Sequence, residues 1–234
     1  MTEAVPALVT LQLWRVPARR VGTALARVAL DRPALRRTPG LRFVKLLGTG
    51  SGRTFTPGDV SPRRWALLAT WDTVADAAGF ADSPVVRRWD RLSEERWAVD
   101  LRPLHSRGRW SGRQPFGDPS PSPYAGAVAA ITRARIAIPK ALTFWRAVPP
   151  VAADLHRAAG LRLAVGIGEA PVGLQGTFSL WSSAEALRDF AYRRPAHVVA
   201  VRRTARERWY AEELFARFAV LHAEGTVDGR DPLR

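Results

Sequence analysis

The chain contains nearly the same pattern twice, and this constrains its fold more than any other feature. The segment 104–113 returns 117 residues later as 221–230, and both copies follow the frame L-H-x-x-G-x-x-x-G-R. Upstream, the segment 40–43 matches 160–163, at an offset of 120 residues. Because the matches keep their order and nearly constant offset, they predict a duplicated half-domain and not a solenoid of many short units.

Each half is expected to run strand, helix, strand, strand, helix, strand. Apolar runs, helical spacing and Gly/Pro breakers predict strands and helices in the first half, with strands at 7–16, 41–47, 65–71 and 97–109 and helices at 21–35, 72–80 and from 84 onward. The second half repeats this order, with strands at 128–138, 161–167, 173–181 and 215–223 and helices at 141–159, after Ser182 or Ser183, and at 195–208. This is the ferredoxin-like plan.

The expected fold class is therefore α+β, with two tandem ferredoxin-like (βαββαβ) repeats. An antiparallel sheet with helices on one face leaves its other face to be covered. Two such sheets can close face to face, which gives a dimeric α/β barrel-like fold within one chain. We expect an N-terminal half over residues 1–113, a linker with four prolines over 114–126, and a C-terminal half over 127–234.

Composition limits the class of protein. A chain of 234 residues with 47% hydrophobic residues is long and apolar enough for a globular core. No stretch approaches the roughly 20 apolar residues that span a bilayer, and no signal peptide is recognisable at the N-terminus. The chain has no cysteine, which rules out disulfides and thiolate ligands. We expect a cytoplasmic protein, and the sequence leaves open a peripheral contact with a membrane.

The net charge of +15 does not indicate nucleic-acid binding. Lys45 and Lys140 are the only lysines, so nearly all of the positive charge is arginine, scattered along the chain in an Ala-, Gly- and Pro-rich background. No nucleic-acid motif accompanies it. We therefore expect no nucleic-acid partner, whereas attraction to an anionic membrane surface remains open.

Four segments, at 37–48, 107–113, 209–218 and 224–232, together closely resemble the spheroidene monooxygenase family of carotenoid-oxidising enzymes. The resemblance extends from about residue 11 to residue 232. It implies a monooxygenase that uses haem b to insert oxygen into a lipophilic substrate, either carotenoid-like or a secondary metabolite. The turn Gly48–Gly52 lacks the order of a dinucleotide fingerprint, so electrons are expected from an external donor such as a ferredoxin.

A haem iron needs an axial ligand, and without cysteine the usual candidate is histidine, with tyrosine next. The candidates are His105, His156, His197, His222, Tyr124, Tyr192 and Tyr210. His105 and His222 repeat in both halves, which favours a shared structural turn, and His156 suits a helix C-terminus. His197 occurs only in the second half, where the first half has Ser83–Val86, and the resemblance also implies a histidine there. We predict His197 as the iron ligand, with an exposed histidine at a helix N-terminus as the alternative.

Other site residues follow from the chemistry of haem. Arg202, with Arg203 and Arg206 nearby, suits a propionate, because guanidinium binds carboxylates with two parallel hydrogen bonds. Phe178 and Trp181, together with Phe144 and Trp145, could line a flat apolar cavity, and ordinary core packing is the alternative. Glu212 and Glu213 are adjacent and should point to opposite sides, so ion pairs with Arg206 and Arg217 are expected in place of catalysis. No catalytic residue is assigned.

Three other functions stay open at this stage. The chain could be a haem-dependent dehydratase or lyase of a nitrogen-containing substrate, a haem or lipophile carrier without turnover, or a barrel oxygenase that uses no cofactor. Dependence on O2 separates the monooxygenase from the lyase, and an optical spectrum separates the haem proteins from the cofactor-free enzyme. Homo-oligomerisation is also left open.

Overall fold

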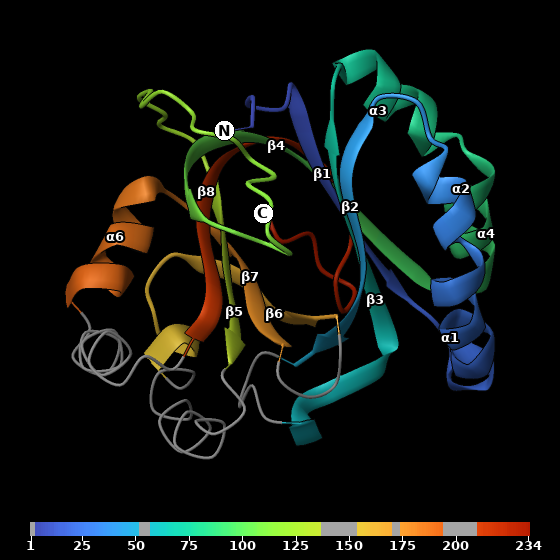
Figure 1. Ribbon diagram of the computed structural model, residues 1–234. Coiled ribbons are helices and arrows are strands. Elements are labelled where there is room, and N and C mark those ends of the chain that lie inside the picture. The colour runs from blue at the N-terminus through green and yellow to red at the C-terminus, as the bar shows by residue number, and fades with distance from the viewer. Residues whose placement is uncertain (1–2, 52–56, 137–153, 170–173, 194–209) are drawn as a thin grey trace.

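Eight antiparallel strands form a closed barrel in the computed structural model (Figure 1). The structure describes residues 3–51, 57–136, 154–169, 174–193 and 210–234. Around the barrel the strand order is β1-β3-β2-β6-β7-β5-β8-β4. The strands of the first half are β1 (Leu8–Arg15), β2 (Leu41–Gly50), β3 (Val60–Trp71) and β4 (Glu95–Gly108). Those of the second half are β5 (Val128–Ile136), β6 (Leu161–Gly168), β7 (Leu174–Trp181) and β8 (Tyr210–Gly225).

The two halves use the same strand order and the same register. In the first half the order is β4-β1-β3-β2, and in the second it is β8-β5-β7-β6. Trp71 pairs with Leu41 and Trp181 pairs with Leu161, and a register shift follows both pairs at the same step. The halves join along a short seam between β2 and β6 and a long seam between β4 and β8. The predicted α+β class is confirmed, and the hydrogen-bonded order closes the sheet.

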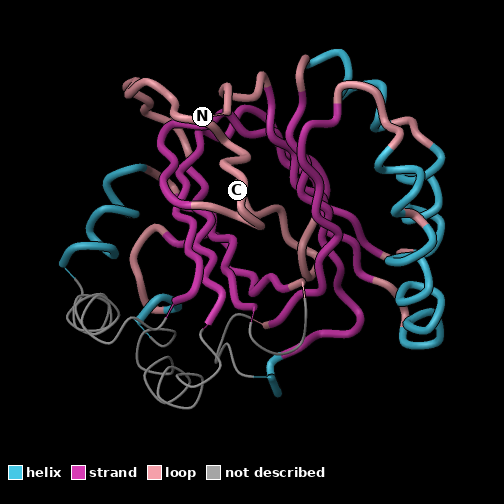
Figure 2. Tube along the Cα trace, viewed as in Figure 1, coloured by secondary structure: helices cyan, strands magenta, loops and turns pink. Residues whose placement is uncertain are grey.

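Helices cover the outside of the barrel on two opposite sides (Figure 2). The first half carries the helices α1 (Val21–Leu30), α2 (Arg32–Arg36), α3 (Val74–Ala81) and α4 (Pro84–Leu92), with 3₁₀ turns η1 (Ala18–Arg20) and η2 (Pro57–Asp59). In the second half the structure describes α6 (Ala184–Arg193). None of the helices within the described ranges has the length and apolar character needed to cross a membrane. Most of the helix predicted at 141–159 and all of the helix predicted at 195–208 lie outside the described residues; of the former, residues 154–159 are described and 154–156 are helical.

Side-chain caps mark the helix starts. Thr73 accepts a hydrogen bond from the Asp76 amide at the start of α3, and Ser83 accepts one from the Val86 amide at the start of α4. In the second half Ser183, and not Ser182, accepts from an amide in the first turn of α6. Each cap satisfies a donor that the first turn of a helix leaves free.

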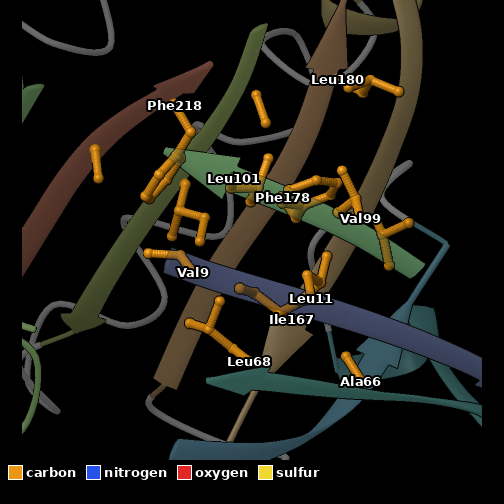
Figure 3. Packing of buried hydrophobic residues seen from close by; sticks show 14 of the residues in the cluster. Val9, Leu11, Ala66, Leu68, Val99, Leu101, Ile167, Phe178, Leu180 and Phe218 are labelled. Atoms are coloured by element: carbon orange, nitrogen blue, oxygen red, sulfur yellow. The ribbon is translucent and has the colours of Figure 1, made fainter. Parts of the chain in front are cut away.

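The barrel interior is filled with apolar side chains from both halves. Figure 3 shows Val9, Leu11, Val99, Phe178 and Phe218 pointing into the same core from strands of the two halves. Phe116, within the predicted linker, is also fully buried there and packs edge-on against Phe218, with ring centroids 4.9 Å apart. The segment between the halves therefore contributes to the core as well as joining them.

The repeated sequence motif forms a turn that closes each end of the long seam. Ser111 and Gly112 both have positive φ, 54° and 74°, as the two central residues of a type I′ turn require. The second copy repeats this at Asp228 and Gly229, with φ of 54° and 75°. Trp110 from the first copy inserts into the barrel core, and Val227 occupies the matching place in the second copy.

Each turn is held by a glutamate from the opposite half. Glu212 accepts hydrogen bonds from the amides of Ser111 (3.0 Å) and Gly112 (2.7 Å). Glu95, which lies 117 residues before Glu212, accepts from the Gly229 amide at 2.7 Å and from a threonine hydroxyl of the second turn. This reciprocal arrangement explains why the motif is present in both halves.

Gly108 should tolerate no side chain. Its φ is +90°, and a Cβ there would lie 2.2 Å from the Glu213 carbonyl oxygen. We expect Gly108→Ala to lower the free energy of unfolding by about 3 kcal/mol, from backbone strain and the clash across the seam. Urea unfolding followed by circular dichroism measures this. In the control, Gly79→Ala, the new methyl meets open space within α3 and should be neutral or stabilising. Equal stability of the two variants would contradict the proposed packing.

Candidate functional site

The structure describes three of the four histidines and all three tyrosines. His105, His156 and His222 are all exposed. His222 lies across the β4–β8 seam from Asp100, where burial raises the pKa of the Asp100 carboxyl and the nearby imidazole partly offsets this. Tyr124 donates to the Val220 carbonyl oxygen. Within the described ranges no three His, Asp or Glu side chains gather into a possible metal site.

Phe178 and Trp181 lie on opposite faces of β7 and do not line one cavity. Phe178 points into the barrel and packs beside Trp97, with centroids 6.0 Å apart (Figure 3). Trp181 points outward and packs against Phe190 of α6 at 5.2 Å. Both are fully buried. The remaining predicted site residues lie outside the described residues, namely His197, Arg202, Arg203, Arg206, Phe144 and Trp145.

The outward faces of the two half-sheets can be compared position by position, because their registers match. Leu46 pairs with Leu67 in the first half, and Gly166 pairs with Thr177 at the same step of the second. On the neighbouring strand, Trp14 corresponds to Ala134, since β1 and β5 both begin opposite the matched tryptophans. Two leucines and an indole are thus replaced by glycine, threonine and alanine.

We call this low outward surface of the second half the shelf. It comprises small side chains from β5, β6 and β7, namely Ala130, Thr132, Ala134, Ala164, Gly166, Thr177 and Ser179. In the first half the same space is filled, because Trp14 stacks on Trp89 of α4 at 5.4 Å and Trp65 lies 6.1 Å from Trp89. The shelf lacks this bulk, although its Ala130, Ala134 and Ser179 are buried and Ala130 packs with Leu155 and Leu187.

A second asymmetry lies inside the barrel. Arg133, on β5, is 4% exposed and forms ion pairs with Glu212 and, at 3.6 Å, with Glu169. Its guanidinium also lies over the Trp110 ring, 5.5 Å from the centroid, and Trp110 donates its indole N–H to Glu169. Lys45 completes the cluster with a 2.6 Å ion pair to Glu169.

Among the described residues, the first half has ion pairs of Arg15 with Glu95 and Asp228 at the matching turn, but they are partly exposed and the matched buried positions carry no charge. At an offset of 120 residues, Leu13 stands where Arg133 is, and Thr49 stands where Glu169 is. Leu13 belongs to the apolar core. Aligning the two halves at this offset reveals Arg133 and Glu169 from the sequence as charged residues at uncharged positions of the first half. Without that alignment they do not stand out, because the chain has many charged residues.

Glu212 links this cluster to the repeated turn. Burial raises its pKa, but hydrogen bonds from the Gly112 amide, from Arg133 and from the Ser111 amide outweigh burial and hold the pKa below its ordinary value. The ion-pair role predicted for Glu212 is confirmed, but its partner is Arg133 on β5, not Arg217. The prediction missed this partner because Arg133 is distant in sequence and reaches Glu212 only through the pairing of β5 with β8.

Sequence comparison identifies the relatives of this chain. Spheroidene monooxygenase of Rhodobacter capsulatus is 39% identical over 215 residues, covering 89% of this chain and 88% of the relative. The chain belongs to the spheroidene monooxygenase family. The enzyme of the same name from Rubrivivax gelatinosus is 40% identical over 223 residues, with coverage of 95% and 85%. No family model matches the chain.

Among solved structures, the barrel is similar to aldoxime dehydratases. One, crystallised with butyraldoxime, superposes with a TM-score of 0.61 at 13% identity, covering 91% of this chain and 79% of that one. A second aldoxime dehydratase gives a TM-score of 0.58 at the same identity, with coverage of 91% and 80%. At this identity the similarity concerns the fold alone.

Glu212→Gln should destabilise the barrel, because it removes the negative charge that pairs with the buried guanidinium of Arg133. We expect a loss of about 3 kcal/mol in the free energy of unfolding at pH 7, measured by urea titration. Because the folded-state pKa of Glu212 is lowered, its contribution is present above the ordinary pKa of 4.5 and disappears as the pH falls through the folded value. The difference between wild type and variant should therefore shrink at acid pH.

The control for this experiment is the adjacent glutamate. Glu213 alternates to the opposite face of β8, so Glu213→Gln should change the stability by less than about 0.5 kcal/mol. A Glu212→Gln variant as stable as this control at pH 7 would show that the cluster does not hold the barrel end.

Proposed function

We propose that this protein is a haem-dependent monooxygenase that inserts oxygen into a lipophilic, carotenoid-like substrate. Membership of the spheroidene monooxygenase family supports an oxygenase, and the names of the relatives support a carotenoid substrate. The single structural observation that supports a bound planar cofactor is the shelf. The shared strand order and offset support the further proposal that the halves are tandem repeats of which the second has diverged to carry the cofactor.

The residues on the shelf suit a porphyrin. Alanine, glycine and threonine side chains present a flat, mostly apolar surface without a charge, which is what the face of a haem requires. By contrast, the matched surface of the first half carries Trp14 and Trp65 under α4, so it has no room for a ring. Histidines exposed on the described strands are poor ligands, so the proposal rests on His197.

We assign roles accordingly. His197 would bind the iron, and Arg202 would pair with a propionate; both follow from the sequence and lie outside the described residues. Phe178 serves the barrel core beneath the shelf, and Trp181 packs beside α6 at its edge. The bound haem would supply activation of O2, whereas the chain holds the cofactor, excludes water with its apolar surfaces and orients the substrate. Electrons would come from an external donor such as a ferredoxin.

The decisive test is an optical spectrum of the protein purified after expression with ample haem. We expect a Soret band with about one haem per chain, and His197→Ala should abolish it or shift it strongly. His222→Ala is the control, because that exposed side chain lies across from Asp100, and its spectrum should equal the wild type. A colourless wild-type protein would overturn the proposal in favour of a cofactor-free oxygenase.

Filling the shelf should block haem binding without unfolding the protein. Thr177→Leu restores the leucine found at the matched place in the first half, and combining it with Ala134→Leu adds further bulk. We expect the double variant to lose at least tenfold in haem affinity, measured by titration of the apoprotein with hemin. Thr177→Val keeps the volume and should bind as the wild type does. Unchanged affinity in the double variant would place the cofactor elsewhere.

Turnover separates the remaining alternatives. A monooxygenase consumes O2 in proportion to oxygenated product and stops under anaerobic conditions with a reductant present. A haem-dependent dehydratase would work without O2, and a carrier would bind haem or lipophile and give no product with any donor. Product formation from a carotenoid under argon would overturn the oxygenase proposal.

A further inference from the structure

The first-half helix α1 presents an unusual surface to solvent. Every residue of α1 that the structure exposes is uncharged, namely Gly22, Thr23, Leu25, Ala26, Ala29 and Leu30. Leu25 is 56% exposed and Leu30 is 62% exposed. A helix on the surface of a soluble domain usually turns charged side chains to water. This apolar face therefore indicates a binding surface.

The apolar face is not needed for packing on the barrel. The opposite side of α1 makes those contacts, with Ala24 fully buried and Val21 and Val28 packed against the first-half core. Helices α1 and α2 lie on the side of the barrel opposite α6 (Figure 1). Leu25 and Leu30 are therefore available to something outside the molecule.

Unpaired positive charge flanks this face. The segment 18–37 carries six arginines and a single aspartate, Asp31. Asp31 is 1% exposed, forms ion pairs with Arg88 at 2.7 Å and with Arg27 at 3.8 Å, and accepts a hydrogen bond from the indole N–H of Trp89. The exposed arginines at the two ends of the segment make no ion pair with any described residue, namely Arg19, Arg32, Arg36 and Arg37.

A basic groove runs beside the apolar face, between α1 and α4. It has a volume of about 460 Å³ and is lined by Arg20, Thr23, Arg27, Arg88, Arg91 and Leu92. Guanidinium groups bind phosphate oxygens through two parallel hydrogen bonds. The groove therefore suits a phosphate whose attached chains continue along the neighbouring apolar face.

We propose that α1 and α2 dock this protein on an anionic lipid bilayer. The face from Leu25 to Leu30 enters the boundary between headgroups and acyl chains, and the flanking and groove arginines bind lipid phosphates. Charge complementarity and the single convex helix favour this occupant over an acidic protein. A helix of ten residues is about 15 Å long and, with its side chains, about 10–12 Å across, which is small beside the roughly 800 Å² that each partner buries in a specific protein interface.

The proposal goes beyond the proposed function and does not depend on haem. Its test is flotation of the purified full chain with vesicles of phosphatidylcholine alone or with about one third phosphatidylglycerol, at about 0.15 M salt. We expect the protein to float with the anionic vesicles and to remain largely free of the neutral ones. Absence of flotation with anionic vesicles would overturn the proposal.

Because the whole chain is basic, matched variants must separate docking from general attraction. Leu25→Glu with Leu30→Glu should weaken binding to anionic vesicles at least tenfold, whereas Val60→Glu with Leu221→Glu, at residues 50% and 51% exposed, should have a far smaller effect. Arg32→Glu with Arg36→Glu should weaken it likewise. Arg157→Glu with Arg188→Glu changes the net charge equally on the α6 side and should leave most binding intact.

Two outcomes would overturn the assignment of this surface. Equal losses in the two arginine pairs would show that net charge alone attracts the protein. The second outcome concerns an acidic protein partner. Such a partner would be indicated if the leucine variant still bound vesicles, if the wild type bound soluble polyglutamate, and if Arg32→Glu with Arg36→Glu abolished the binding to polyglutamate. Circular dichroism melts confirm that each variant is folded, which is expected because all the substituted side chains are exposed.

Discussion

Closure of the barrel along the long seam between β4 and β8 is the constraint on which the rest of the structure depends. At both ends of this seam a glycine brings two backbones together, with Gly108 against the Glu213 carbonyl and Gly225 against the Arg96 carbonyl. The type I′ turn that follows each glycine places Trp110 or Val227 in the core. Because the glutamate that holds each turn belongs to the other half, neither end of the barrel can form from one half alone.

On this nearly symmetric frame the two halves differ in bulk and charge. The outward face of the first half carries Trp14, Leu46 and Leu67, whereas the matched positions of the second half carry Ala134, Gly166 and Thr177. Inside the barrel the second half introduces Arg133 and Glu169 where the first half has Leu13 and Thr49. Burying Arg133 with its paired carboxylates costs desolvation free energy. Glu212 offsets part of that cost, because it pairs with Arg133 and also accepts hydrogen bonds from amides of the turn. Bulk and charge thus diverge in the same half that carries His197.

Sequence reasoning predicted the order of the strands and of most described helices because those signals are local, but it missed the break at Asp31 that divides the predicted helix 21–35 into α1 and α2. Periodicity, the caps Thr73 and Ser83, and the Gly/Pro breakers are each readable within a few residues. The site was harder, because its evidence is non-local. Phe178 and Trp181 were predicted to line one cavity, although a spacing of three residues puts them on opposite faces of a strand. The Arg133–Glu212 ion pair forms because β5 pairs with β8, which the sequence does not show. The shelf is recognised only when the strand registers of the two halves are aligned.

The proposed lipid-docking face and the shelf lie on opposite sides of the barrel, since one belongs to the helices of the first half and the other to the outward sheet of the second (Figure 1). Lipid contact would therefore determine where the protein works, and it would not form a wall of the site itself. The two proposed surfaces thus use different halves: α1 and α2 belong to the first half, and the small residues of the shelf belong to the second. A substrate dissolved in the membrane would have to leave the bilayer and pass around the barrel to reach the shelf. Membrane docking by the first half and cofactor binding by the second half can therefore be altered independently.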